Sequence, residues 1–215
     1  MTGPITPRAI SSLPTDFPIF PLGGALLLPK GQLPLNIFEP RYLRMVDDAL
    51  RGERMIGMVQ PTEDDGAIPA IFNVGCAGRI TTFSETDDGR YHIVLTGLCR
   101  FLVKREIATD MPYRMVEADF QPFAYDLHKD EVGDKVDREL FLEIMFDYMN
   151  ASDLTADWEA AKSASIESLV MSLSMGCPFA NSEKQALLEA PTTADRAECL
   201  MALMEMAGGE EPTVQ

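Results

Sequence analysis

The chain has 215 residues, of which 46% are hydrophobic and 24% are charged, a composition typical of a globular protein. It contains no run of about 18 apolar residues that could span a membrane, and its N-terminus lacks the basic and apolar segments of a signal peptide. The four cysteines form no C-x-x-C pair, which predicts buried thiols in a reducing compartment. We therefore expect a cytoplasmic protein without disulfides that does not enter a membrane.

The formal net charge of −16 is distributed unevenly. Residues 17–120 hold 11 Lys and Arg against 14 Asp and Glu, a net charge of −3. Residues 121–215 hold 6 against 19, a net charge of −13. An acidic surface repels phosphate backbones, so the second half argues against nucleic acid as a partner, whereas the first half leaves that question open.

The N-terminal part predicts a short leader and then an apolar segment divided by prolines. Residues 1–14 are expected to be a flexible leader. The stretch from Phe17 to Tyr42 contains five prolines, which divide it into a strand, a turn at residues 29–31 and a second strand. A helix is expected to start at Pro40, because apolar residues recur at helical spacing until Gly52. These apolar residues are Tyr42, Met45, Val46 and Ala49.

Further strands are predicted up to residue 120. Residues 53–60 form an apolar run that ends at Pro61, and an acidic loop is expected over 62–70. The β-rich runs 80–84 and 91–95 flank Asp87-Asp88-Gly89, a strong hairpin signal. Two more strands are expected over 100–107 and 114–120, with Met111-Pro112 between them. Many short strands with one helix predict a small irregular barrel over residues 15–120.

The hydrophobic period becomes helical after residue 121. Apolar stripes predict helices over 136–148 and 166–173, with Gly176 and Pro178 ending the second. A short helix over 181–189 is expected to be capped by Ser182 or Asn181, and a last helix by Thr193, with Gly208-Gly209 closing it. The sequence thus predicts an α+β protein, with a helical bundle over 121–207 and a flexible tail over 208–215.

Catalytic motifs are missing from the sequence. There is no Walker A loop, no G-x-G-x-x-G opening a βαβ unit and no G-x-S-x-G elbow. The two histidines, His92 and His128, have no surroundings typical of a catalytic set. The acidic runs 63–65 and 130–131 lack the ligand spacing of an EF-hand loop. We therefore expect no catalytic residue, no cofactor and no metal site.

Two long motifs carry a family resemblance. The segment FPLGGALLLPKGQLPLNIFEPRYLRMVDDAL and the segment VGCAGRITTFSETDDGRYHIVLTGLCRFLV resemble the N-terminal, substrate-binding domain of Lon proteases. The resemblance extends over about residues 17–207, including EKQALLE and residues 196–203 of the helical end. It implies a PUA-like β-pseudo-barrel followed by an α-helical bundle.

The resemblance also implies a function. In full-length Lon proteases this domain precedes an ATPase module and a serine–lysine protease domain, and it takes part in recognising substrates and in assembly. The chain shows neither module, so the resemblance implies a stand-alone, non-catalytic module that binds unfolded or damaged polypeptides. Such a module would serve as an adaptor in protein quality control, with a Lon-type or other ATP-dependent protease as a further partner, and it could be an oligomer.

Two alternatives remain open beside this interpretation. PUA-like folds elsewhere handle RNA, so a nucleic-acid or nucleotide binder is the first alternative; an undetected hydrolase is the second. The first alternative rests on the basic residues of the barrel half. These are Arg41, Arg44, Arg51, Arg54, Arg79, Arg90, Arg100, Lys104, Arg105 and Arg114.

Three residues are candidates for contact with a polypeptide: Glu39, Arg41 and Tyr42. In the functional interpretation, Glu39 and Arg41 form a polar pair at the edge of a groove. In the structural interpretation, Glu39 lies at a helix N-terminus, Arg41 pairs with it locally, and Tyr42 is a core residue with a bonded hydroxyl. A binding surface is otherwise expected on the exterior of the barrel or at its junction with the bundle.

Overall fold

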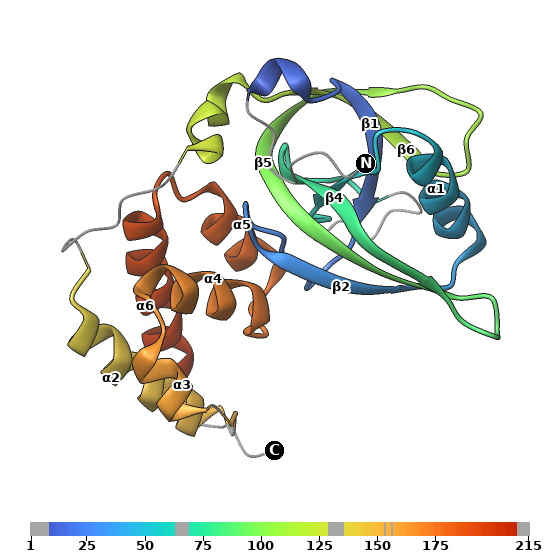
Figure 1. Cartoon of the computed structure of the whole chain (residues 1–215). Coiled ribbons are helices and arrows are strands. Elements are labelled where there is room, and N and C mark those ends of the chain that lie inside the picture. Colours follow the sequence, from blue (N-terminus) through green and yellow to red (C-terminus); the bar gives the residue numbers. More distant parts are fainter. Residues whose placement is uncertain (1–8, 63–68, 129–135, 153, 156, 210–215) are drawn as a thin grey trace.

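The computed structural model describes residues 9–62, 69–128, 136–152, 154–155 and 157–209. Its first half is a curved β-sheet and its second half is a group of helices (Figure 1). The strands are β1 (Asp16–Pro21), β2 (Gln32–Ile37), β3 (Met55–Val59), β4 (Val74–Glu85), β5 (Tyr91–Ile107) and β6 (Arg114–Asp119). This arrangement confirms the predicted α+β class.

The sheet closes into a barrel because β5 pairs with three other strands. The strand order is β2-β5-β4-β3-β1-β6, and β5 also pairs with β6. All pairings are antiparallel except that of β1 with β3. One edge of β5 pairs with β4, and the other pairs first with β2 and then with β6. Strand β2 therefore lies outside the closed ring and ends the sheet.

The expected break between residues 95 and 100 is wrong, because β5 runs without interruption for 17 residues. Register shifts in the β4 and β6 ladders accompany its bend around the barrel. Gly97 does not interrupt the strand but permits a close approach. A Cβ there would lie 2.0 Å from the carbonyl oxygen of Leu28, in the turn between β1 and β2.

The first helix agrees with its prediction. Helix α1 (Pro40–Arg51) begins at Pro40, and it buries the four apolar residues predicted from helical spacing. Ile10–Ser12, within the expected leader, forms a 3-10 turn, and Leu13 is buried in the barrel core. The last residues of the expected leader therefore belong to the folded part. Residues 1–8 and most of the acidic loop over 62–70 lie outside the described residues.

The second half packs around its last helix. After the 3-10 segment η2 (Gln121–Leu127), α6 contacts α2, α4 and α5. The helices are α2 (Arg138–Ala151), α3 (Trp158–Ser163), α4 (Ile166–Gly176), α5 (Asn181–Glu189) and α6 (Thr193–Gly209). Helix α3 was not predicted, because its six residues are too few to show a period.

Three predicted helix ends are wrong. Neither Ser182 nor Asn181 caps α5: the N-cap position is Ala180, Ser182 lies inside the helix, and the amide of Asn181 bonds to the loop around Gly24 and to the carbonyl of Pro61. The side chain of Thr192, rather than Thr193, accepts the N–H bond of Asp195 at the start of α6. Helix α6 continues through both closing glycines to Gly209. The tail beyond it lies outside the described residues.

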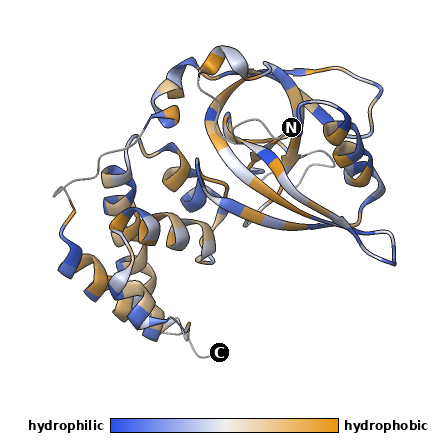
Figure 2. Cartoon of the chain, in the orientation of Figure 1, coloured by the Kyte–Doolittle hydropathy of each residue, from blue (hydrophilic) through white to orange (hydrophobic). Residues whose placement is uncertain are grey.

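One apolar cluster joins the two halves of the molecule. It contains core residues of the barrel, such as Ile56 and Leu95, together with bundle residues such as Phe141 and Leu200. Hydropathy alternates along the barrel strands, as expected where one face is buried (Figure 2). Because the core is continuous, a surface between barrel and bundle is supported from both sides.

Candidate functional site: a groove between barrel and bundle

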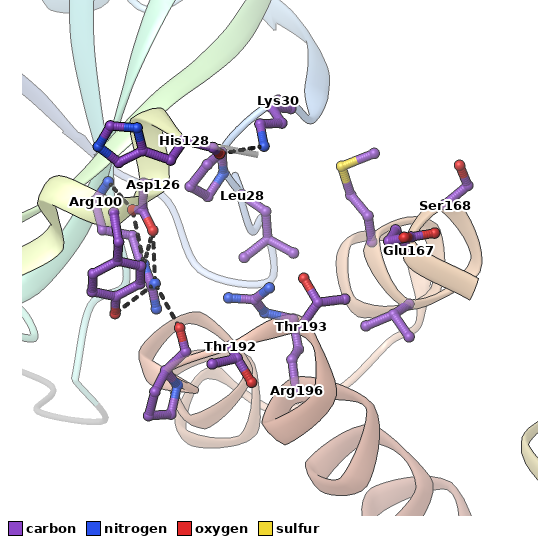
Figure 3. Close-up of a pocket in the computed structure, with 15 residues that line it drawn as sticks. Leu28, Lys30, Arg100, Asp126, His128, Glu167, Ser168, Thr192, Thr193 and Arg196 are labelled. Atoms are coloured by element: carbon purple, nitrogen blue, oxygen red, sulfur yellow. Dashed lines mark hydrogen bonds and ion pairs between the residues drawn. The ribbon is translucent and has the colours of Figure 1, made fainter. Parts of the chain in front are cut away.

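A cavity of about 440 Å³ lies where the barrel meets the bundle (Figure 3). Leu28 and Lys30 border it from the barrel, Glu167 and Ser168 from α4, and the start of α6 from below in the view. Its lining combines apolar and polar side chains. The full set is Leu28, Pro29, Lys30, Arg100, Tyr125, Asp126, His128, Glu167, Ser168, Val170, Met171, Pro191, Thr192, Thr193 and Arg196.

The innermost part of the groove is an ion pair between Arg100 and Asp126. Their side chains are only 2% and 5% exposed, and Arg100 Nη2 lies 2.8 Å from Asp126 Oδ1. The backbone N–H of Arg100 also donates to Asp126 Oδ2 at 2.8 Å. The remaining guanidinium hydrogens donate to the hydroxyl of Tyr125 and to the carbonyls of Leu188, Ala190 and Pro191.

This pair connects three parts of the chain: β5, η2 and the corner between α5 and α6. Along one edge of β5, residues 91–96 pair with β2 and residues 102–107 pair with β6. The ion pair lies between these two paired segments. Burial alone would lower the pKa of Arg100, but the bonds and the charge of Asp126 outweigh it and raise that pKa. Arg100 is therefore a permanent cation with a structural role.

The turn at residues 28–31 forms the barrel side of the groove. The N–H of Lys30 donates to the carbonyl of Gly97, and the N–H of Gly97 donates to the carbonyl of Gly31. Lys30 has a φ of 69°, in the left-handed region, and its ammonium donates to the carbonyl of His128 at 3.0 Å. A Cβ on Gly31 would lie 2.5 Å from Met175 Sδ of α4. The turn therefore lies in close contact with both β5 and the bundle.

The start of α6 forms the opposite side. Thr192 and Asp195 bond reciprocally, which satisfies the first N–H groups of the helix. The guanidinium of Arg196 donates to the carbonyls of Leu187 at 2.7 Å and Ala190 at 3.3 Å. The cations of the groove are thus bound to protein carbonyls and carboxylates, an arrangement that suits a binding surface better than a reaction site.

The three residues predicted to contact a polypeptide lie elsewhere, at the start of α1, which is on the side of the barrel away from the bundle (Figure 1). Arg41 pairs with Glu39 at 2.8 Å, and both side chains are about half exposed. Tyr42 is buried, and its ring packs against Phe20 with the ring centres 4.2 Å apart. The structure therefore keeps Glu39 and Arg41 together at the surface and places Tyr42 in the core.

Sequence reasoning missed Arg100 and Asp126 as a pair. Arg100 stands in the apolar run GLCRFLV, and a charge inside a buried strand requires a buried partner. That signal was available. The identity of the partner was not, because Asp126 lies in a segment with no periodic pattern.

Metal-binding clusters and membrane-spanning helices are both absent from the described residues. No cluster of three or more His, Cys, Asp or Glu side chains there is placed to hold a metal ion. In the same residues, no helix is both long enough and apolar enough to cross a membrane.

A closed barrel with an added edge strand, followed by a helical bundle, is the fold of Lon N-terminal domains. The crystal structure of a Lon N-terminal domain protein from Xanthomonas campestris matches with a TM-score of 0.61 and 24% identity, over 87% of this chain and 98% of that one. The N-terminal domain of a Mycobacterium avium complex Lon protease matches with a TM-score of 0.62 and 16% identity, over 88% and 98%. The chain belongs to the family described as the ATP-dependent protease La (LON) substrate-binding domain, whose pattern matches residues 16–206.

Curated relatives agree with this assignment. A Lon protease of Azorhizobium caulinodans is 26% identical over 93% of this chain and 24% of its own length. A Lon protease of Anaeromyxobacter dehalogenans is 31% identical over 47% of this chain and 12% of its own length. The chain therefore corresponds to at most about a quarter of these two relatives.

Proposed function

We propose that this protein binds unfolded or damaged polypeptides as a non-catalytic recognition module and that the groove between barrel and bundle receives them. The observation that supports the proposal most strongly is the match of residues 16–206 to a substrate-binding domain family. The expected adaptor role, with a Lon-type or other ATP-dependent protease as partner, is part of the same proposal.

The chemistry of the groove suits a polypeptide segment. Half-buried Pro29 and Met171 offer apolar contact, while Ser168 and Thr193 offer hydroxyls within the same hollow. Tyr125 is 46% exposed and presents an aromatic ring beside them. Apolar surface combined with a few polar groups that fix orientation is typical of binding sites.

The ion pairs of the barrel argue against the nucleic-acid alternative. Phosphate recognition needs cations that are free to contact a backbone. Eight of the ten basic residues that motivated this alternative have carboxylate partners in the structure. These are Arg41, Arg44, Arg51, Arg90, Arg100, Lys104, Arg105 and Arg114.

The test is a binding titration with reduced, carbamidomethylated α-lactalbumin as a permanently unfolded probe and the native protein as control. We expect saturable binding of the unfolded probe only. Ser168→Trp should fill the groove and weaken binding at least tenfold, whereas Ser172→Trp, on an exposed position of α4 outside the lining, should not.

Three results would separate the alternatives. Absence of saturable binding at tens of micromolar would refute the function. Equal binding by both tryptophan variants would refute the site, and loss of binding on Arg41→Ala alone would assign it to α1 instead.

A further inference from the structure

The sheet has an open edge at β2. Among the described residues, β2 pairs only with β5, through Gln32–Thr96 at one end and Ile37–Tyr91 at the other. An unpaired edge presents backbone N–H and C=O groups that another extended chain can bond. What this edge can bind therefore depends on which backbone N–H and C=O groups of β2 face away from β5.

Two hydrogen bonds, one at the end of the β2–β5 ladder and one in the hairpin between β4 and β5, identify those groups. The N–H of Gly97 donates to the carbonyl of Gly31, and the N–H of Thr86 donates to the carbonyl of Arg90. Because bonded and non-bonded pairs alternate along antiparallel strands, Leu33, Leu35 and Ile37 bond to β5. The backbone groups of Gln32, Pro34 and Asn36 consequently face away from β5, along the open edge.

Pro34 fits this assignment. A proline lacks the N–H group and is tolerated in a sheet where that group would face solvent. At the open edge its missing N–H costs no bond to β5. The edge thus offers the N–H groups of Gln32 and Asn36, and the carbonyls of residues 32, 34 and 36.

The outer face beside this edge contains a hollow whose lining is free of acidic residues, lysine and arginine. This hollow, of about 410 Å³, lies over β2, β5 and β4. Its lining is formed by Pro34, Leu35, Asn36, Thr82, Ser84, His92, Ile93 and Val94. Just beyond β2, Phe38 is 61% exposed, with the Arg90 guanidinium 5.9 Å from the ring centre. In a chain of net charge −16, a hollow of this kind at an open strand edge is distinctive.

We propose that β2 is a docking strand, to which an extended, uncharged segment of a partner polypeptide adds as a further strand. The partner's backbone bonds to residues 32, 34 and 36, and every second side chain lies on the outer face, beside the part of the hollow that Pro34 and Asn36 form. A charged side chain of the partner at this position would lose hydration without gaining an ionic partner. The site therefore favours segments with neutral side chains. This surface is separate from the groove between barrel and bundle.

A second copy of the chain is a poorer occupant on grounds of charge. Each copy carries −16, so pairing of two copies through β2 brings like charges together. A short neutral segment meets no such repulsion. Sedimentation of the free protein separates these cases, and a concentration-dependent dimer that is lost on Asn36→Pro would overturn the proposal.

The probe is a labelled nine-residue peptide with blocked ends, whose six central residues alternate Thr and Val to match the length of β2. We expect saturable binding by fluorescence anisotropy. The same peptide with N-methyl groups on its central amides keeps its side chains but cannot form strand bonds, and it should bind at least tenfold more weakly. Equal binding of both peptides would overturn the proposal.

Two substitutions on β2 test the edge in opposite directions. Pro34→Val adds an outward N–H and should tighten peptide binding at least threefold, a gain that misfolding cannot produce. Asn36→Pro removes an outward N–H while leaving the bonds to β5 in place, and should weaken binding at least tenfold. Ser168→Trp should leave peptide binding unchanged, so this proposal and the groove proposal fail independently. Unchanged affinity in Pro34→Val would overturn the docking strand.

Discussion

Arg100 on β5 and Asp126 in η2 form a buried ion pair, with Nη2 and Oδ1 2.8 Å apart. The guanidinium hydrogen bonds that do not go to Asp126 reach the corner between α5 and α6 or the hydroxyl of Tyr125. The pair therefore joins the barrel to the bundle directly beneath the groove. Because both charges are removed from water, each depends on the other to remain there.

Asp126→Asn should destabilise the protein by about 3–5 kcal/mol, since it leaves the Arg100 charge buried without its counter-ion. Arg100→Met should cost a similar amount, because it also frees carbonyls of the α5–α6 corner. A double-mutant cycle in urea should show strong coupling between the two sites. Arg41→Met breaks an exposed pair and serves as control, with an expected change below about 1 kcal/mol. Equal effects of Arg100→Met and Arg41→Met would contradict this account.

Gly97→Ala should destabilise the protein by more than about 2 kcal/mol, because the new Cβ would overlap the carbonyl oxygen of Leu28. The backbone of the turn would have to move, and with it the barrel side of the groove. Gly176→Ala is the matched control, since no atom lies within 4 Å of its added Cβ. We expect Gly176→Ala to be neutral or slightly stabilising in thermal unfolding, as alanine favours a helix. A neutral Gly97→Ala would show that the turn is not fixed.

Sequence reasoning predicted the elements with a clear period and missed what depends on contacts distant in sequence. The buried stripe of α1 was predicted residue by residue, because helical spacing is a local property. The continuity of β5 was missed, since Gly97 looks like a break until the turn that approaches it is known. Asn181 was expected to cap α5, but its amide bonds Gly24, 157 residues away in sequence.

The groove illustrates the same limit. Its lining comes from the turn before β2, from β5, from η2, from α4 and from the start of α6, so no single segment of the sequence contains a motif for it. The sequence predicts a turn at residues 29–31, and the structure adds that this turn contacts the bundle through Gly31 and Lys30. A composite surface of this kind follows from the packing of the whole chain.

The cysteines should differ in reactivity according to burial. Burial raises the pKa of the Cys99 thiol to about 12, and it also raises the pKa values of Cys76 and Cys177. These three thiols are buried, whereas Cys199 is half-buried. With Ellman's reagent at pH 8, we expect one thiol per chain to react before unfolding and four after. Cys199→Ser should abolish the early reaction, and early labelling that persists in this variant would place another thiol at the surface.

Lys184 should make stability depend on pH. Its side chain is 1% exposed, with Nζ 3.1 Å from the carbonyl of Met175, and burial lowers its pKa. Between the lowered pKa of the folded state and the unfolded value of about 10.4, only the unfolded chain holds the proton, so stability rises with pH. The difference in free energy of unfolding between wild type and Lys184→Met should therefore shift in favour of the wild type from pH 7.5 to 10.

The comparison with Lys184→Met cancels the opposite contribution of the buried thiols. Their raised pKa values make the folded state lose stability as pH rises above about 8.5, where thiols of the unfolded chain ionise. Both proteins carry the same cysteines, so the contributions of Cys76 and Cys99 cancel, and the difference reports Lys184 together with its charge interaction with Cys177. A pH-independent difference for Lys184→Met would mean that the ammonium stays protonated in the core across this range.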